Sequence, residues 1–245
     1  MSSKLTRGLT RTRLGRRVLG RAILDVPEFA LGTLGWSLAS EARVPAADEL
    51  PATLDEFEQL APVVLSSNAA NRGLASMRLD EAAHLWSLAR SVGAATIVEI
   101  GRERGGSTLL LAAAMGPQAR LHSYDPQTKL GVAGPDAPLA ALLDRYGLSG
   151  RVELHVADSH AVEPPGGEFG LVLVDGDPTY VGSRLDYERF CLRLRPGGHA
   201  LFHDAVPPGL RHEALGPLLL EIEREGELDR QPNVGTFAHF TRRGG

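Results

Sequence analysis

Acidic, glycine and hydroxyl residues gather at the end of one apolar segment. Residues 97–112 read IVEIGRERGGSTLLLA, which predicts a buried strand ending near Glu99, a tight turn and a helix. Gly101 and Gly105 would let the backbone approach a ligand, and Ser107 would stand at the helix N-terminus, where free N–H groups attract an anion. Because an acid suits an ammonium group and a helix N-terminus suits a carboxylate, the turn favours an α-amino acid moiety.

The same turn fits two phosphate-binding patterns poorly. A dinucleotide-binding turn needs a glycine two residues after its first one, but this position after Gly101 holds Glu103, whose charge would repel a pyrophosphate. The loop that ends in Gly-Lys-Ser/Thr is absent, because no lysine precedes the hydroxyl residues of the turn. An oxidoreductase with a nicotinamide cofactor is therefore disfavoured. Arg102 and Arg104 flank Glu103, where they could meet an acidic substrate, but we expect them to be solvated.

Polar residues also end the next three apolar segments. Asp125 ends the first of them, and a carboxylate there can accept hydrogen bonds from both hydroxyls of a ribose. Asp158 and Ser159 follow the second, where they could meet the edge of an adenine or simply cap the next segment. Asp175 ends the third and would lie next to a sulfonium. The ligand expected from these positions is an amino acid joined through sulfur to adenosine.

Strands and helices alternate along the chain. The pattern predicts helices over residues 78–93, 107–115, 137–148, 181–194 and 210–226, strands over residues 95–100, 120–125, 151–158, 169–177, 199–204 and 234–242, and a turn at residues 196–198. Several strands are apolar throughout, which is typical of a parallel sheet covered on both faces. We therefore expect an α/β fold, a Rossmann-like, doubly wound, mostly parallel sheet over residues 76–245. A basic, helical extension and a linker would occupy residues 1–75.

Five segments resemble, in this order, the class I S-adenosylmethionine-dependent methyltransferases: EIGRERGGST, LHSYDP, ADS, LVLVDGDPTY and LRPGGHALFHD. Within that class they are most similar to the small-molecule O-methyltransferases of the catechol type and of the macrolide-sugar and cephalosporin-tailoring group. The resemblance implies S-adenosyl-L-methionine as cofactor and O-methylation of a sugar or another small molecule of natural product biosynthesis. It places Glu99, Gly101 and Ser107 on the methionine part, Asp125 on the ribose, Asp158 and Ser159 near the adenine, and Asp175 near the transferred methyl group.

The resemblance also implies one way of activating the acceptor oxygen. In its metal-dependent members, carboxylates at the ends of the fourth and fifth strands hold Mg²⁺, which binds the substrate oxygens. Asp175 and Asp204 occupy these positions, and Asp177 is a further candidate. The set is incomplete, because Ala205 stands where catechol-type enzymes have Asn, and His203 precedes Asp204 where the macrolide-sugar group often has a second acid.

A general base is the other way, and His203 at the end of the fifth strand is the candidate. Simple positioning of donor and acceptor is a third way. Pro178 replaces a histidine that is common in relatives, and with Ala205 it supports an alternative function. That alternative is a methyltransferase-like protein that binds an S-adenosyl ligand but performs another reaction or a binding role. The remaining histidines show no metal-ligand spacing with one another in the sequence.

Composition bounds these expectations. The chain has 245 residues, a formal net charge of −4 and 23% charged residues, which favours a small-molecule acceptor and gives no reason to expect nucleic acid binding. Its single cysteine, Cys191, excludes an internal disulfide and lies in a helical pattern, so we expect a core position. A reducing cytoplasm suits this cysteine usage.

The N-terminal segment is basic. Seven Lys and Arg residues precede the first acid, Asp25, with apolar residues loosely spaced like one helical face. Residues 1–40 could therefore lie on a membrane surface or on an acidic partner. The favoured interpretation is a solvated arm or a contact within a homodimer. No apolar run is long enough to span a bilayer, and Pro27 and Glu28 interrupt what would be the apolar part of a secretory signal.

Overall fold

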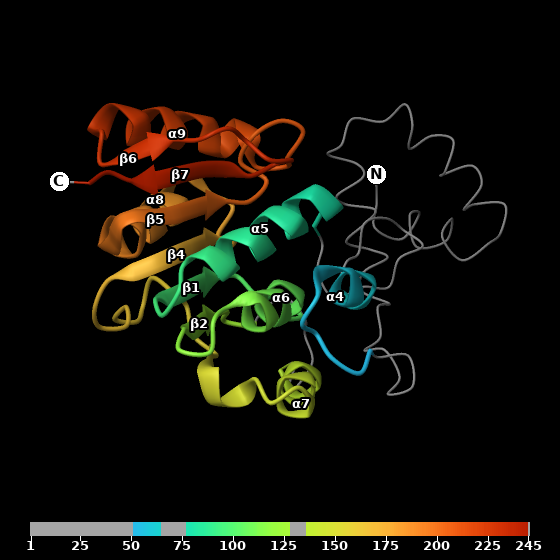
Figure 1. Cartoon of the computed structure of the whole chain (residues 1–245). Helices are drawn as coiled ribbons and strands as arrows, with labels where there is room; N and C mark the ends of the chain where they lie inside the picture. The colour runs from blue at the N-terminus through green and yellow to red at the C-terminus, as the bar shows by residue number, and fades with distance from the viewer. Residues whose placement is uncertain (1–50, 65–76, 128–135, 245) are drawn as a thin grey trace, which may run out of the picture.

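The computed structural model of the chain describes residues 51–64, 77–127 and 136–244 (Figure 1). The basic segment of residues 1–40, with its predicted contact to a membrane surface or a second subunit, lies outside these residues. In the described part, no helix combines the length and the apolar composition needed to cross a membrane.

A seven-stranded sheet with the order β3-β2-β1-β4-β5-β7-β6 forms the centre of the structure. Its strands are β1 (Thr96–Ile100), β2 (Arg120–Tyr124), β3 (Val152–His155), β4 (Phe169–Val174), β5 (Leu194–Phe202), β6 (Leu228–Arg230) and β7 (Ala238–Arg242). The first five strands are parallel, whereas β7 runs antiparallel to β5 and β6 antiparallel to β7. From β1 the chain adds β2 and β3 on one side of the sheet, and it then returns to add β4 and β5 on the other side. This reversal of strand order creates a switch point at the carboxyl ends of β1 and β4.

Helices cover both faces of the sheet, as Figure 1 shows. They are α4 (Phe57–Val64), α5 (Leu79–Ser91), α6 (Gly106–Ala114), α7 (Ala137–Arg145), α8 (Tyr180–Arg189) and α9 (His212–Glu225). Leu85, Leu109 and Leu142 of α5, α6 and α7 belong to one apolar cluster, together with Leu60 of α4. The other cluster contains residues of α8 and α9, such as Tyr187.

Successive residues of a strand point to opposite faces of the sheet and so contribute to different apolar clusters. Ile97 of β1 faces the cluster of α5 and α6, whereas Val98 and Ile100 face the cluster of α8 and α9. All six residues of β4 are buried, as expected for a strand in the middle of a parallel sheet. Each fully buried Val, Ile or Leu side chain stabilises the fold by about 1.5–3 kcal/mol relative to an exposed one.

The predicted fold class is confirmed, and the main differences concern the bounds of β5, the end of α8 and the presence of β6. The strand β5 begins at Leu194, so residues 196–198, predicted as a turn, lie within it. The helix predicted to reach residue 194 ends at Arg189 and continues as a short 3₁₀ turn that contains the buried Cys191. The strand β6 was not predicted, because its three residues, Leu-Asp-Arg, carry no apolar pattern.

Part of the predicted linker is built into the core. Leu54 and Leu60 are buried, α4 packs against α5 and α6, and the hydroxyl of Tyr146 donates a hydrogen bond to the carbonyl oxygen of Pro51 at 2.9 Å. Residues 51–60 therefore belong with the sheet, although the acidic, proline-containing sequence favoured a linker.

The switch point requires glycine at residue 101. Gly101 has a φ of +86°, and a Cβ atom there would lie 2.3 Å from the carbonyl oxygen of Asp175. The turns that follow β1 and β4 thus approach each other through their backbones, which leaves no room for a side chain between them.

We expect Gly101→Ala to lower the free energy of unfolding by much more than Gly93→Ala. Both glycines have a positive φ, so both variants lose about 1–2 kcal/mol through left-handed strain. Only at Gly101 does the new methyl group meet backbone, which adds about 1–3 kcal/mol, because nothing lies within 4 Å of the Cβ position at Gly93. Urea denaturation of the two variants measures the difference, and equal losses would contradict this packing.

Candidate active site

The structure brings most of the predicted site residues to the carboxyl edge of the sheet. Gly101, Asp125, Asp175 and Asp204 follow β1, β2, β4 and β5 at this edge. The backbone links these turns, since the amide of Asp175 donates to the carbonyl oxygen of Ile100 at 2.8 Å and the amide of Gly101 to that of Tyr124 at 2.8 Å.

Glu99 lies below this edge and is fully buried. Its Oε2 atom accepts hydrogen bonds from the hydroxyls of Thr108 and Ser123, each at 2.5 Å, so it ties α6 to β1 and β2. Its Oε1 atom is buried and has no hydrogen bond in the described structure. Burial raises the pKa of Glu99 above its usual value, although the hydroxyls of Ser107, Ser123 and Thr108 lower it.

Asp125 organises the turn between β1 and α6. Its Oδ2 atom accepts hydrogen bonds from the amides of Arg102 and Glu103 at 3.1 and 2.9 Å, and its Oδ1 atom from the amide of Gln127 at 2.6 Å. The carboxylate thus holds Glu103 in its left-handed conformation, with a φ of +48°. This arrangement fixes the shape of the turn that the sequence singled out.

Arg102 is not solvated, contrary to the expectation from the sequence. Its side chain forms a bidentate ion pair with Asp136, at 2.8 and 2.5 Å, and donates to the carbonyl oxygens of Ser123 and His155 at 3.0 and 2.9 Å. The residue is only 2% exposed. Arg102 therefore fastens the ends of β2 and β3 to the chain before α7. Arg104 is half-buried, and its buried Nη1 atom has no hydrogen bond to the rest of the described chain.

Asp158 and Ser159 both make local contacts. The exposed Asp158 accepts a hydrogen bond from the amide of His160 at 2.9 Å, which forms a turn of the kind that aspartate favours. The buried Ser159 donates to Asp186 of α8 at 2.8 Å. Both side chains therefore have structural partners, and their predicted place beside an adenine stays a prediction.

The most heavily charged part of the edge centres on His203. Its Nδ1 atom lies 3.1 Å from Oδ2 of Asp175, and its Nε2 atom lies 3.4 Å from Oε2 of Glu81. On the other side of Asp175, Nη1 of Arg211 lies 2.9 Å from Oδ1, and Nη2 donates to the backbone oxygen at 3.3 Å. We refer to Glu81, Asp175, His203 and Arg211 as the charge network.

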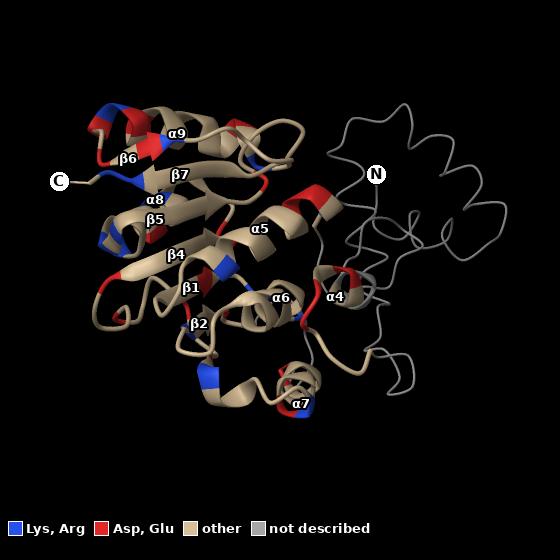
Figure 2. Cartoon of the chain, in the orientation of Figure 1, with Lys and Arg blue, Asp and Glu red and all other residues tan. Residues whose placement is uncertain are grey.

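Glu81 joins helix α5 to this network, and Figure 2 shows the acidic first turn of that helix. Its Oε1 atom accepts hydrogen bonds from the amide and the hydroxyl of Thr236 at 2.6 and 2.7 Å, and its Oε2 atom from the amide of Arg78 at 2.8 Å. Burial raises the pKa of Glu81, but His203 and the two amides outweigh burial and lower it to about 2.

His203 is held in its charged form. Burial lowers its pKa, but the charges of Asp175 and Asp204 and the hydrogen bonds to Asp175 and Glu81 raise the pKa well above 6.5. The side chain is 7% exposed and both ring nitrogens face carboxylates. A ring that already carries both protons cannot accept another one, so this setting does not suit the predicted general base.

Asp175 does not suit the predicted Mg²⁺ site either. A magnesium ion needs carboxylate oxygens and waters in octahedral geometry, whereas the two oxygens of Asp175 face the guanidinium of Arg211 and the imidazolium of His203. Two side-chain cations thus occupy the region where a metal cation would bind. Ala205 is buried and offers no further ligand atom.

Asp204 is the carboxylate of this edge that remains available. It is half-buried, has a φ of +56° and makes no side-chain hydrogen bond to a described residue. Its backbone is fixed, because its carbonyl oxygen accepts the amide of Arg211 at 2.9 Å and Gly209 packs directly against it.

Glu81 and Arg211 were not singled out in the sequence. Glu81 shows only the local signature of a helix cap, Arg78-x-x-Glu, and its reach to Thr236 spans 155 positions of the chain. Arg211 lies in the turn before α9, where nothing in the local pattern distinguishes it from a solvated arginine. Their roles follow only from the three-dimensional arrangement.

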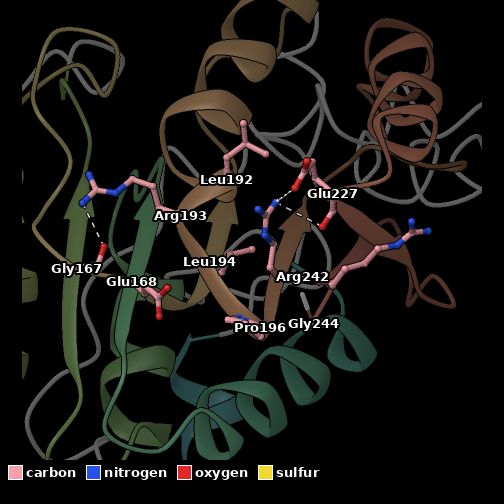
Figure 3. Close-up of a pocket in the computed structure, with 10 residues that line it drawn as sticks. Gly167, Glu168, Leu192, Arg193, Leu194, Pro196, Glu227, Arg242 and Gly244 are labelled. Carbon is pink, nitrogen blue, oxygen red and sulfur yellow. Dashed lines mark hydrogen bonds and ion pairs between the residues drawn. The ribbon is translucent and has the colours of Figure 1, made fainter.

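A cavity of about 440 Å³ lies at the opposite edge of the sheet, beside the start of β4 and β5 (Figure 3). Its arginines have partners: Arg193 donates to the carbonyl oxygen of Gly167 at 3.2 Å, and Arg242 pairs with Glu227 at 2.8 Å. None of the residues predicted to bind a ligand lines this cavity.

Comparisons with known proteins agree with the fold. Residues 98–205 match the family model of a methyltransferase domain. The chain is also 31% identical over 153 residues to the catechol O-methyltransferase of Mycobacterium tuberculosis, over 61% of this chain and 66% of that enzyme. It therefore spans just under two thirds of that relative's length.

Solved structures show the same fold. An O-methyltransferase from Bacillus cereus, in complex with SAH, is 19% identical, with a TM-score of 0.56 over 84% of this chain and 95% of that one. The O-methyltransferase TomG from Streptomyces achromogenes, in complex with SAM and involved in tomaymycin synthesis, is 20% identical, with a TM-score of 0.54 over 69% and 82%. At these identities the similarity concerns the fold.

Residues 98–205 thus resemble a methyltransferase domain, and the described part of the chain has the fold of solved O-methyltransferases. Among curated proteins, the chain is similar to the mycobacterial catechol O-methyltransferase.

We expect His203→Gln to lower the free energy of unfolding by about 3–5 kcal/mol near neutral pH, because Glu81 and Asp175 lose the cation between them. The raised pKa of His203 means that its stabilisation is complete below pH 6.5 and is lost as the pH rises through the raised value. The difference between wild type and variant should therefore narrow only at alkaline pH, as urea denaturation across the pH range would measure.

His84→Gln is the matched control, because burial lowers the pKa of His84. Wild-type stability relative to this variant should fall as the pH decreases below 6.5, which is the opposite sign. A difference at His203 that vanished between pH 6 and 7 would contradict the charge network.

Proposed function

We propose that the protein binds S-adenosyl-L-methionine at the carboxyl edge of its sheet and transfers the methyl group to an oxygen atom of a small molecule. The observation that carries the proposal is the switch point between β1 and β4, where Gly101 brings the two turns together beside Asp125 and Asp175. The methyltransferase match over residues 98–205 covers these residues.

The residues present fit such a cofactor in two respects. The buried Oε1 atom of Glu99 lacks a hydrogen bond within the described chain, which leaves an acceptor for an ammonium group. The buried Nη1 atom of Arg104 lacks one as well, which leaves a donor for a carboxylate. Ser107 at the start of α6 and Asp125 after β2 would complete the contacts to the methionine part and the ribose.

When bound, the cofactor supplies a methyl group on a sulfonium, which an oxygen nucleophile can displace in line. The chain must orient the acceptor and weaken its O–H bond. Asp204 can do both, because its carboxylate forms no hydrogen bond or ion pair with another described side chain and its backbone is held rigidly. The charge network beside it holds Asp175 through His203 and Arg211, without a metal ion.

These features and the relatives support a small-molecule acceptor. We propose a small molecule with a phenolic or similar hydroxyl, since the mycobacterial relative is named for catechol. A sugar or another natural product is the wider class predicted from the sequence. The net charge of −4 favours such an acceptor over a nucleic acid, and the buried, unpaired Cys191 suits a reducing cytoplasm.

Calorimetry with S-adenosylhomocysteine, followed by product mass spectrometry with S-adenosyl-L-methionine, tests the proposed function. We expect binding, and a gain of one methylene mass on catechol and on a phenol with one hydroxyl, because no metal ion has to chelate two substrate oxygens. EDTA should leave the rate unchanged, and added Mg²⁺ should not raise it.

Three other outcomes of these measurements would contradict part or all of the proposal. A rate that EDTA abolishes would contradict the metal-free site. Binding without methylation of any hydroxyl acceptor would favour the alternative function as a binding protein or an enzyme of another reaction. The absence of S-adenosylhomocysteine binding would overturn the proposal.

We expect Asp204→Asn to lower kcat/KM by about 10²–10⁴-fold, the range typical of losing a group that accepts the acceptor's proton. Asparagine keeps the shape of the side chain and tolerates a positive φ, so affinity for S-adenosylhomocysteine should be unchanged. Glu168→Gln, at the opposite edge of the sheet, is the control with full activity. Full activity in Asp204→Asn would rule out this role for Asp204.

A further inference from the structure

A second cluster of polar side chains lies on the edge of the sheet, away from the charge network. His122 of β2 pairs in register with Glu153 of β3, and Tyr124 with His155. Because alternate residues of a strand share a face, His122, Glu153 and His155 all project from the same face of the sheet. We refer to these three residues as the β2–β3 cluster.

Three potential ligand atoms of this cluster lie close together. Nδ1 of His122 is 3.2 Å from Nε2 of His155 and 3.4 Å from Oε2 of Glu153, and the third separation, from Nε2 of His155 to Oε2 of Glu153, is 3.8 Å. In a tetrahedral zinc site with bonds of 2.0–2.1 Å, ligand atoms are separated by about 3.3–3.4 Å. The cluster therefore matches three corners of such a tetrahedron to within about half an ångström.

The surroundings hold His155 in place and leave one side of the cluster open to solvent. The ring of His155 lies parallel to that of Tyr124, with centroids 4.3 Å apart, and its carbonyl oxygen accepts a hydrogen bond from Arg102. The side chains of His122 and His155 are 15% and 32% exposed, whereas that of Glu153 is 60% exposed. A metal ion could thus enter from solvent and keep a water molecule as its fourth ligand.

The two imidazole rings also lie within hydrogen-bond distance of each other. Without metal, one ring nitrogen donates its hydrogen to the other. Binding requires that this hydrogen move to the second nitrogen of the same ring, so no net proton is lost from the imidazoles.

We propose that His122, Glu153 and His155 form a binding site for Zn²⁺ or a similar divalent transition-metal ion. Two imidazole nitrogens and one carboxylate oxygen are ligands that zinc prefers, whereas Mg²⁺ and Ca²⁺ prefer oxygen atoms alone. The site joins the edge strand β3 to β2 and so stabilises the edge of the sheet. It is separate from methyl transfer and does not rest on the proposed function.

Zinc calorimetry on chelator-treated, full-length protein tests the site, with Co²⁺ absorption as a second measurement. We expect one zinc ion per chain, a raised melting temperature, and the intense visible bands of tetrahedral Co²⁺. His122→Gln and Glu153→Gln should each weaken zinc binding by about 10-fold or more. Circular dichroism of the metal-free variants checks that they fold, which the exposure of Glu153 favours.

His199→Gln is the matched control. Nδ1 of His199 lies 3.1 Å from Nε2 of His239, which is the same kind of histidine pair, but no carboxylate completes it into a cluster of three in the described chain. This variant should bind zinc like the wild type. Failure of the wild type to bind zinc would overturn the proposal, as would equal binding by the folded His122→Gln and Glu153→Gln variants, which would place the ion elsewhere.

Discussion

The carboxylate of Asp175 is the point on which the arrangement of the site depends. It lies at the end of the central strand β4, its backbone presses against Gly101, and its two oxygens face Arg211 and His203. Through His203 the same interaction reaches Glu81, and through Glu81 it reaches α5 and Thr236. One partly buried set of charges therefore connects both faces of the sheet at the edge where a ligand of this fold class binds.

The charge network is stable only when each of its charges has a partner of opposite sign. Buried charges lose their hydration, and their mutual attraction compensates for this loss when each one has a partner. Here the two carboxylates of Glu81 and Asp175 are matched by the imidazolium of His203 and the guanidinium of Arg211, so the network is neutral as a whole. A neutral and rigid network can position a reaction, but it has little tendency to take up a proton or a metal ion.

The fold class could be predicted from the sequence because apolar runs and glycine-containing turns are local features of the chain. The buried run of β4 and the glycine turn after β1 could be recognised without knowing any neighbour. The strand β6 and the start of β5 were missed, because polar residues and Pro196 hide strands that pair only through β7 and β4. Segment 51–60 was taken for a linker, since its acidic residues do not reveal that Leu54 and Leu60 reach the core.

For the site, the sequence identified which residues lie at the strand ends but not which of them face one another. Arg102 was expected in solvent because no local pattern reveals Asp136 as its partner. The sequence predicted His203 as a base because it does not reveal that Glu81, more than a hundred residues earlier, lies beside the second ring nitrogen of His203. Likewise, His122 and His155 show no ligand spacing along the chain, and only the register of β2 and β3 brings them together.

The completeness of the charge network has an evolutionary consequence. Exchange of Arg211 or His203 alone leaves a carboxylate of the network without its counter-ion, and an asparagine at position 205 would not by itself make Asp175 accessible to a metal ion. Passage between metal-using and metal-free members of this fold would then require concerted changes in α5, in the end of β5 and in the turn before α9. Among homologues, residues 81, 203 and 211 should therefore covary as one inherited unit, with intermediate combinations rare because they fold poorly.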